Sequence, residues 1–165
     1  MNLPKHIKGC FQKAREYYPE LENINIQIKY TPLTLATMMS KPTTSSFLFP
    51  WKKHKYIISV NSFKKIKRFS VPMGYFSDPI ILGWFGHELA HITQYEKMSQ
   101  RQFISFPVKY LLSRKFRKKF ETKADGITRQ RGLEKELKEG IRFVIDDPRI
   151  NKAYRARTIE FYSRV

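Results

Sequence analysis

Two histidines four residues apart, His87 and His91, enclose the sequence His-Glu-Leu-Ala-His near the middle of the chain. In an α-helix, residues four apart lie on one face, so both imidazoles can bind the same metal ion. Glu88 follows the first histidine directly and is placed to take a proton from a water molecule that the metal activates. The spacing therefore predicts a metal site in which Glu88 is the general base.

Two acidic residues downstream, Glu121 and Asp125, are spaced four apart in a second predicted helix. A catalytic zinc site has three protein ligands and one open position for water. We expect Glu121 to be the third ligand and Asp125 to accept the free N–H of a liganding histidine. Ala124 is small enough to let the two helices approach closely. The competing interpretations are that the histidines are ordinary helix residues and that Glu121 pairs with Lys118 or Lys119 on a solvated face.

These two elements resemble those of the gluzincin metallopeptidases, the thermolysin-like clan in which an H-E-x-x-H helix is followed by an E-x-x-x-D helix. The residues that carry the resemblance are His87, Glu88, His91, Glu121 and Asp125. The form Glu-x-x-Ala-Asp is most similar to that of the small members, which include minigluzincins and the catalytic cores of membrane-bound zinc endopeptidases. The resemblance covers residues 79–132. Metzincins and SprT-like proteases fit less well, because both use a third histidine that this chain lacks after the pair.

The resemblance implies a zinc metallopeptidase with one zinc ion per chain and a peptide or protein as substrate. In gluzincins an antiparallel edge strand above the active-site helix binds the substrate as an added strand, and we expect the segment 55–61 to be that strand. A Tyr, His or Arg normally assists the oxyanion, and Tyr154 and Arg155 are the candidates here.

The elements that must hold these residues change type along the chain. Alternating apolar residues over 24–30 and β-branched or aromatic residues over 55–61 predict two strands, and 35–40 is a further candidate strand. With a helix over 4–18 and further helices after the strands, the order favours an α+β fold. We expect a small, mostly antiparallel N-terminal sheet followed by the active-site helix and the ligand helix. The segment 62–78 is basic and is predicted to be irregular.

The active-site helix is predicted to begin at Asp78 as N-cap, with Pro79 in its first turn. Its apolar face, roughly opposite the histidines, is predicted from four residues at helical spacing: Ile81, Phe85, Leu89 and Ile92. A second helical region is predicted over 107–131, with Gly132 as its C-terminal cap, and a third over 133–145.

The C-terminal segment 149–165 is basic and is predicted to be at most weakly helical. It ends in a Thr-Ile-Glu-Phe-Tyr run that could pair with an exposed edge strand and occlude the cleft, in its own chain or in a neighbouring one. Self-association is therefore also a possible property of the protein.

Composition limits the class of protein further. The chain has 165 residues, of which 41% are hydrophobic, which suits one domain over 1–165. A single cysteine, Cys10, excludes an internal disulfide and a Cys-rich zinc module. No apolar run is long enough for a signal peptide or a membrane span, so we expect a cytoplasmic protein that could be peripheral to the membrane.

The net charge of +18 predicts an anionic partner, which could be a lipid surface, a nucleic acid or an acidic protein. An apolar-aromatic stretch over 103–112 precedes a basic run over 114–119, an order typical of an interfacial helix. From the sequence, a core-packed helix with a solvated lysine face is the preferred explanation. Two alternatives to the enzyme remain: a non-enzymatic nucleic-acid-binding protein, and a zinc-bound regulator whose cleft is blocked.

Overall fold

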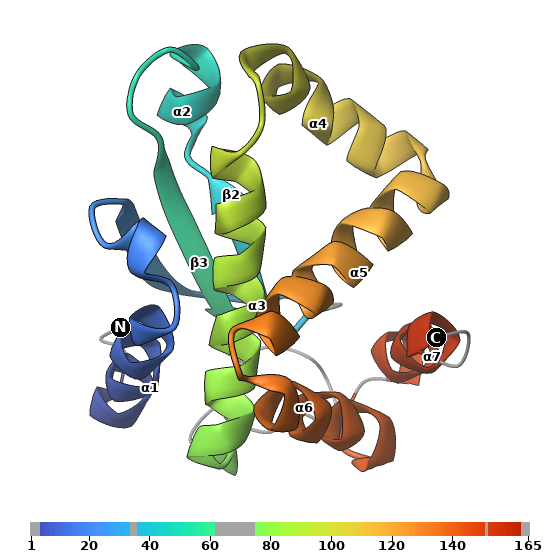
Figure 1. Cartoon of the computed structure of the whole chain (residues 1–165). Helices are drawn as coiled ribbons and strands as arrows, with labels where there is room; N and C mark the ends of the chain where they lie inside the picture. The colour runs from blue at the N-terminus through green and yellow to red at the C-terminus, as the bar shows by residue number, and fades with distance from the viewer. Residues whose placement is uncertain (1–3, 34–35, 62–74, 151, 163–165) are drawn as a thin grey trace.

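The computed structural model describes residues 4–33, 36–61, 75–150 and 152–162. It has an α+β fold, with a small sheet in the N-terminal half and a helical region after it, as predicted. Helix α3 (Asp78–Glu96) runs through the centre, with α1 (Lys5–Glu16) and the sheet on one side and the later helices on the other (Figure 1). This central helix carries the H-E-x-x-H residues.

The sheet is mixed, whereas the sequence led us to expect a mostly antiparallel one. Its strands are β1 (Asn25–Thr31), β2 (Met38–Pro42) and β3 (Lys55–Asn61), in the order β1-β3-β2. β1 pairs with β3 in parallel, and β2 pairs with β3 antiparallel. The expectation that β3 is the edge strand is therefore wrong: β3 is central, and β2 is the edge strand that packs against α3.

A physical reason for the central position of β3 is visible in its side chains. Tyr56, Ile58, Ser59 and Val60 are all buried, so β3 is covered on both faces of the sheet. A strand with two buried faces is typically a nearly continuous apolar run, whereas an edge or half-exposed strand alternates. β1 does alternate between exposed and partly buried residues.

The segments around β2 also differ from the prediction. The strand occupies 38–42 instead of 35–40, and a short helix, α2 (Thr44–Leu48), follows it. Thr43 caps α2 by accepting a hydrogen bond from the backbone N–H of Ser46. A 3₁₀ turn (Pro19–Leu21) separates α1 from β1. The predicted irregular segment lies mostly outside the described residues.

The predicted burial of α3 is confirmed: Ile81, Phe85, Leu89 and Ile92 are completely buried. The helix is in fact buried on nearly every side. Its N-cap is Ser77, one residue before the predicted Asp78.

The region predicted as one helix over 107–131 is two helices, α4 (Gln100–Leu112) and α5 (Arg114–Gln130). Ser99 starts α4 with a capping box to Gln102, so Pro107 lies inside the helix and not at its start. Ser113 ends α4 and caps α5 by accepting a hydrogen bond from the Phe116 N–H. Gly132, with φ of 85°, ends the α5 region as predicted.

Helix α6 (Glu134–Asp146) packs on α3 with almost no space between the two backbones. A Cβ added at Gly83 would lie 2.4 Å from the carbonyl carbon of Glu136, and one at Gly140 would lie 2.6 Å from Nε1 of Trp84. Both positions therefore need glycine for close approach.

The C-terminal segment forms a helix, α7 (Lys152–Tyr162), which packs on α6 (Figure 1). The prediction of weak helicity at best is thus wrong, and so is pairing of this segment with an edge strand, because its backbone N–H groups are used within a helix.

Candidate metal centre

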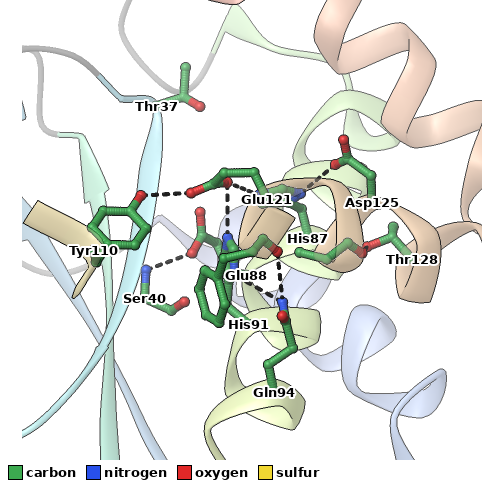
Figure 2. Close-up of polar contacts among 12 residues, drawn as sticks. Thr37, Ser40, His87, Glu88, His91, Gln94, Tyr110, Glu121, Asp125 and Thr128 are labelled. Atoms are coloured by element: carbon green, nitrogen blue, oxygen red, sulfur yellow. Dashed lines mark hydrogen bonds and ion pairs between the residues drawn. The ribbon is translucent and has the colours of Figure 1, made fainter. Parts of the chain in front are cut away.

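Three side chains from two helices converge beside α3. The Nε2 atoms of His87 and His91 are each 3.2 Å from Oε2 of Glu121, which projects from α5 (Figure 2). One nitrogen or oxygen atom of each residue lies within 4.8 Å of the other two, so the group could hold a metal ion. The structure thus brings together the three ligands predicted from the sequence.

The spacing of these atoms is compatible with a bound metal ion. Ligands about 2.0–2.1 Å from a tetrahedral ion lie roughly 3.3 Å from one another. The two observed nitrogen–oxygen distances of 3.2 Å are close to that value. Among the ion pairs of the described residues, those of Glu121 are with the histidines and not with Lys118 or Lys119.

Asp125 orients His87 from the opposite side of the ring. Its Oδ1 lies 2.8 Å from Nδ1 of His87, and the Asp125 side chain is buried. An N–H at Nδ1 that donates to Asp125 leaves the Nε2 lone pair of a neutral His87 facing the Glu121 carboxylate. Two electron-rich atoms in that position repel each other unless a cation or a second ring proton lies between them. The geometry predicted for Asp125 is present.

Without a metal, these groups favour charged forms. Burial alone would lower the pKa of His87, but its hydrogen bonds to Asp125 and Glu121 outweigh that cost and raise the pKa well above its usual value. Burial likewise opposes the Glu121 charge, yet the two histidines hold its pKa well below the usual range. The carboxylates of Glu121 and Asp125 therefore favour a positive charge on His87.

The Glu88 carboxylate, on the same helix as the two histidines, contacts the edge of the sheet. Its side chain is buried, and its Oε2 accepts a hydrogen bond of 2.6 Å from the backbone N–H of Ser40 in β2 (Figure 2). The hydroxyl of Ser40 is buried without a hydrogen-bond partner in the described part of the chain. The free edge of β2 therefore adjoins the residue expected to be the general base.

Tyr110, which the sequence analysis missed, donates a hydrogen bond of 2.7 Å to Oε1 of Glu121. This bond occupies one carboxylate oxygen and leaves Oε2 to face the histidines. Burial first, and then the Glu121 charge, raise the pKa of Tyr110, so it remains a donor. No local signal reveals this contact, because Tyr110 lies on α4 and the pairing depends on how α4 folds back on α5.

Gln94 is the second residue that the sequence analysis missed. Its Nε2 donates to the carbonyl of Phe120 and lies 3.3 Å from Nδ1 of His91. The His91 ring also stacks on the Phe120 ring, with centroids 4.7 Å apart. The contact between Gln94 and His91 could have been predicted from the sequence, because Gln94 is three residues after His91 and shares its face of the helix.

The two oxyanion candidates behave differently. The Tyr154 hydroxyl lies 3.5 Å from Oγ1 of Thr37, just before β2. Burial raises the pKa of Tyr154, and its hydrogen bonds with Thr37 partly oppose that shift. No hydrogen bond or ion pair among the described residues joins Arg155 to the metal ligands, so the structure does not bring it to the site.

The C-terminal helix also reaches the site. The hydroxyl of Tyr162 donates a hydrogen bond of 3.0 Å to Oδ2 of Asp125, the oxygen that does not face His87. Both carboxylate oxygens of Asp125 are thereby engaged.

Comparisons of the chain with protein-family models, curated proteins and solved structures find no significant match. What the geometry establishes is a group of two histidines and one glutamate that could hold a metal ion.

Proposed function

We propose that this protein is a zinc-dependent metallopeptidase that hydrolyses peptide bonds in peptides or proteins. The observation that carries the proposal is the convergence of His87, His91 and Glu121, with Glu88 one residue from the first ligand. Two imidazole nitrogens and one carboxylate oxygen form a donor set typical of catalytic zinc, and softer or purely oxygen-seeking ions fit it less well.

The ligands require specific protonation, which the surrounding residues support. Asp125 holds the His87 proton at Nδ1, so that Nε2 is free to bind. Binding through Nε2 of His91 likewise puts the proton of the neutral ring on Nδ1. Tyr110 restrains Glu121 through Oε1.

A zinc ion bound there would act as a Lewis acid on the peptide carbonyl and lower the pKa of water toward about 7. Glu88 accepts the proton as the water oxygen bonds to the carbonyl carbon. It then delivers that proton to the amide nitrogen while the C–N bond breaks, which yields a carboxylic acid and an amine.

The substrate is proposed to bind along β2 and not along β3. The outer edge of β2 carries no further strand among the described residues, and the Ser40 N–H on it reaches Glu88. An extended peptide added to this edge would have its backbone fixed by main-chain hydrogen bonds, close to the general base.

A second candidate function is a metal-binding regulator that does not turn over substrate. The contact of Tyr162 with Asp125 favours it, because α7 brings the end of the chain to the metal centre. In that case the metal is bound at full occupancy while no peptide is cleaved.

The test combines metal analysis with a peptide-hydrolysis screen. Protein purified without chelator should contain about one zinc per chain. Glu88→Gln should keep that zinc and lose hydrolysis by at least about 100-fold. Glu16→Gln, on the exposed side of α1, is the matched control and should remain active. Absence of zinc binding would refute both candidates. Full zinc with no cleavage, also after truncation of residues 152–165, would favour the regulator.

A further inference from the structure

Helix α4 is apolar on two opposite sides, which is unusual for a helix on the surface. One side packs into the protein through Phe103 and Phe106, both buried. The other side exposes four large apolar residues. These are Ile104 at 57%, Val108 at 59%, Leu111 at 72% and Leu112 at 82% relative exposure. A helix that is apolar all round normally has a partner on both sides.

A second exposed apolar segment lies at the same end of the molecule. The connection that follows α2 exposes Trp51 at 66% of its surface and Phe49 at 42%. Phe47 of α2 contacts Phe103 of α4, with ring centroids 4.9 Å apart, and Figure 1 shows α2 and α4 at one end of the fold. Together, the exposed residues of α4 and of this connection are called the apolar end below.

The charge around the apolar end is mainly positive, and the nearby carboxylate of Glu96 is paired with His54. The sequence contains no Asp or Glu over 23–77 and none over 97–120, the two segments that supply the apolar end. Exposed cations interrupt the apolar residues in both: Lys52 and Lys53 beside Trp51, and Arg101 and Lys109 on α4. None of the ion pairs found among the described residues involves these four cations.

We propose that the apolar end is a docking surface for an anionic phospholipid bilayer. Large apolar side chains enter the boundary between headgroups and acyl chains, while the interspersed cations pair with lipid phosphates and carboxylates. Trp and Phe prefer this boundary. No helix within the described ranges is long and apolar enough to traverse a bilayer.

Other partners match only part of this surface. The phosphates of a nucleic acid would pair with the cations, but they would not bury the exposed side chains of Leu111 and Leu112. A second copy of the chain accounts for the apolar residues but brings the same positive charge into the contact, which opposes association. An anionic bilayer matches both features at once.

The surface is linked to the metal centre by α4 itself. Tyr110, which contacts Glu121, lies on the same helix as the exposed Val108 and Leu111. The inference does not depend on the metal or on peptidase activity, because it is carried by exposure and charge alone.

The experiment is sedimentation of the full chain with vesicles of phosphatidylcholine, with and without phosphatidylserine. We expect binding only when phosphatidylserine is present, weakening as salt is added. Of the two tryptophans, Trp84 is buried and Trp51 exposed. Docking should therefore shift the Trp51 emission to shorter wavelength.

Two double variants separate the contributions of the apolar residues and of the cations to vesicle binding. Leu111→Gln with Leu112→Gln should weaken binding by tenfold or more, on the order of the loss of two partly inserted side chains. Arg101→Gln with Lys109→Gln should weaken it by roughly 25-fold, at about fivefold per cation. Lys135→Gln with Arg142→Gln removes the same charge from exposed positions of α6 and should have a much smaller effect.

Each contrary outcome overturns the proposal. Failure to bind phosphatidylserine vesicles overturns it. So does an equal loss of vesicle binding in the α6 control and in the α4 charge variant, because that would indicate general charge attraction. Binding to duplex RNA but not to vesicles would make the partner a nucleic acid. A dimer in solution that the leucine variant converts to monomer, with no vesicle binding, would make it a second copy. Because the charge variant leaves the apolar residues intact, it remains informative even if the leucine variant misfolds.

Discussion

Helices α3 and α4 are both rich in apolar residues, yet the protein uses them in opposite ways. α3 is buried on nearly every side, and the polar side chains in its centre, His87, Glu88, His91 and Gln94, all have hydrogen-bond partners. α4 is buried through one side and exposes apolar residues on the other. Burial in α3 fixes polar groups where their interactions are strong, whereas exposure in α4 leaves apolar surface available for a partner.

The largest effect is expected from removing a ligand of the metal centre. Glu121→Ala should reduce zinc occupancy from about one per chain to almost none, since it removes one of three protein ligands. Metal analysis by mass spectrometry after dialysis measures this directly. Glu139→Ala on α6 is the control. Full occupancy in the Glu121 variant would mean that a different residue completes the site.

Replacing a large side chain by Ala should have very different effects on stability on the two sides of α4. Phe103→Ala should lower the free energy of unfolding by about 3–5 kcal/mol, because it leaves a cavity among packed rings. Ile104→Ala, at the neighbouring and mainly exposed position, should lower the free energy of unfolding by only about 0.5 kcal/mol. Urea denaturation compares the two variants. Similar losses would mean that the exposed side of α4 is also packed.

Glycine substitution tests how tightly α3 is held. Gly83→Ala should destabilise the protein by about 1–3 kcal/mol, since the added Cβ would meet the backbone of Glu136. Gly9→Ala in α1, where nothing lies within 4 Å of the added carbon, should instead stabilise by roughly 0.5–1 kcal/mol. In thermal unfolding, we expect Gly83→Ala to lower the melting temperature and Gly9→Ala to raise it. A neutral Gly83→Ala would show that α3 and α6 can separate at little cost.

The smallest expected effect concerns the orientation of a ligand. Asp125→Asn keeps the size of the side chain but weakens its hold on the His87 N–H, so zinc affinity should fall by about 10–100-fold while the fold is retained. Competition with a fluorescent zinc chelator measures this change. Asp146→Asn makes the same exchange at the exposed end of α6 and is the matched control. Unchanged affinity in the Asp125 variant would remove Asp125 from the proposed site.

Two parts of the candidate site, one on each helix, could be predicted from local periodicity alone. Residues spaced four apart share a helix face wherever the helix lies, so the pairing of His87 with His91 and of Glu121 with Asp125 follows from the sequence itself. The apolar face of α3 and the cap at Gly132 follow from equally local rules.

Contacts between distant segments were not predictable in this way. Tyr110 reaches Glu121 only because the chain turns at Ser113, where one serine ends α4 and caps α5. Ser40 reaches Glu88 only because β3 takes the centre of the sheet and leaves β2 at its edge.

The helicity of α7 shows the same division. Its sequence predicts at most weak helicity, whereas the folded segment is a helix that packs on α6. Residue types and helical spacing thus specify which groups can act together on one helix. The tertiary fold decides which strand, loop or second helix meets them, because those contacts depend on burial of surfaces that are far apart in the sequence.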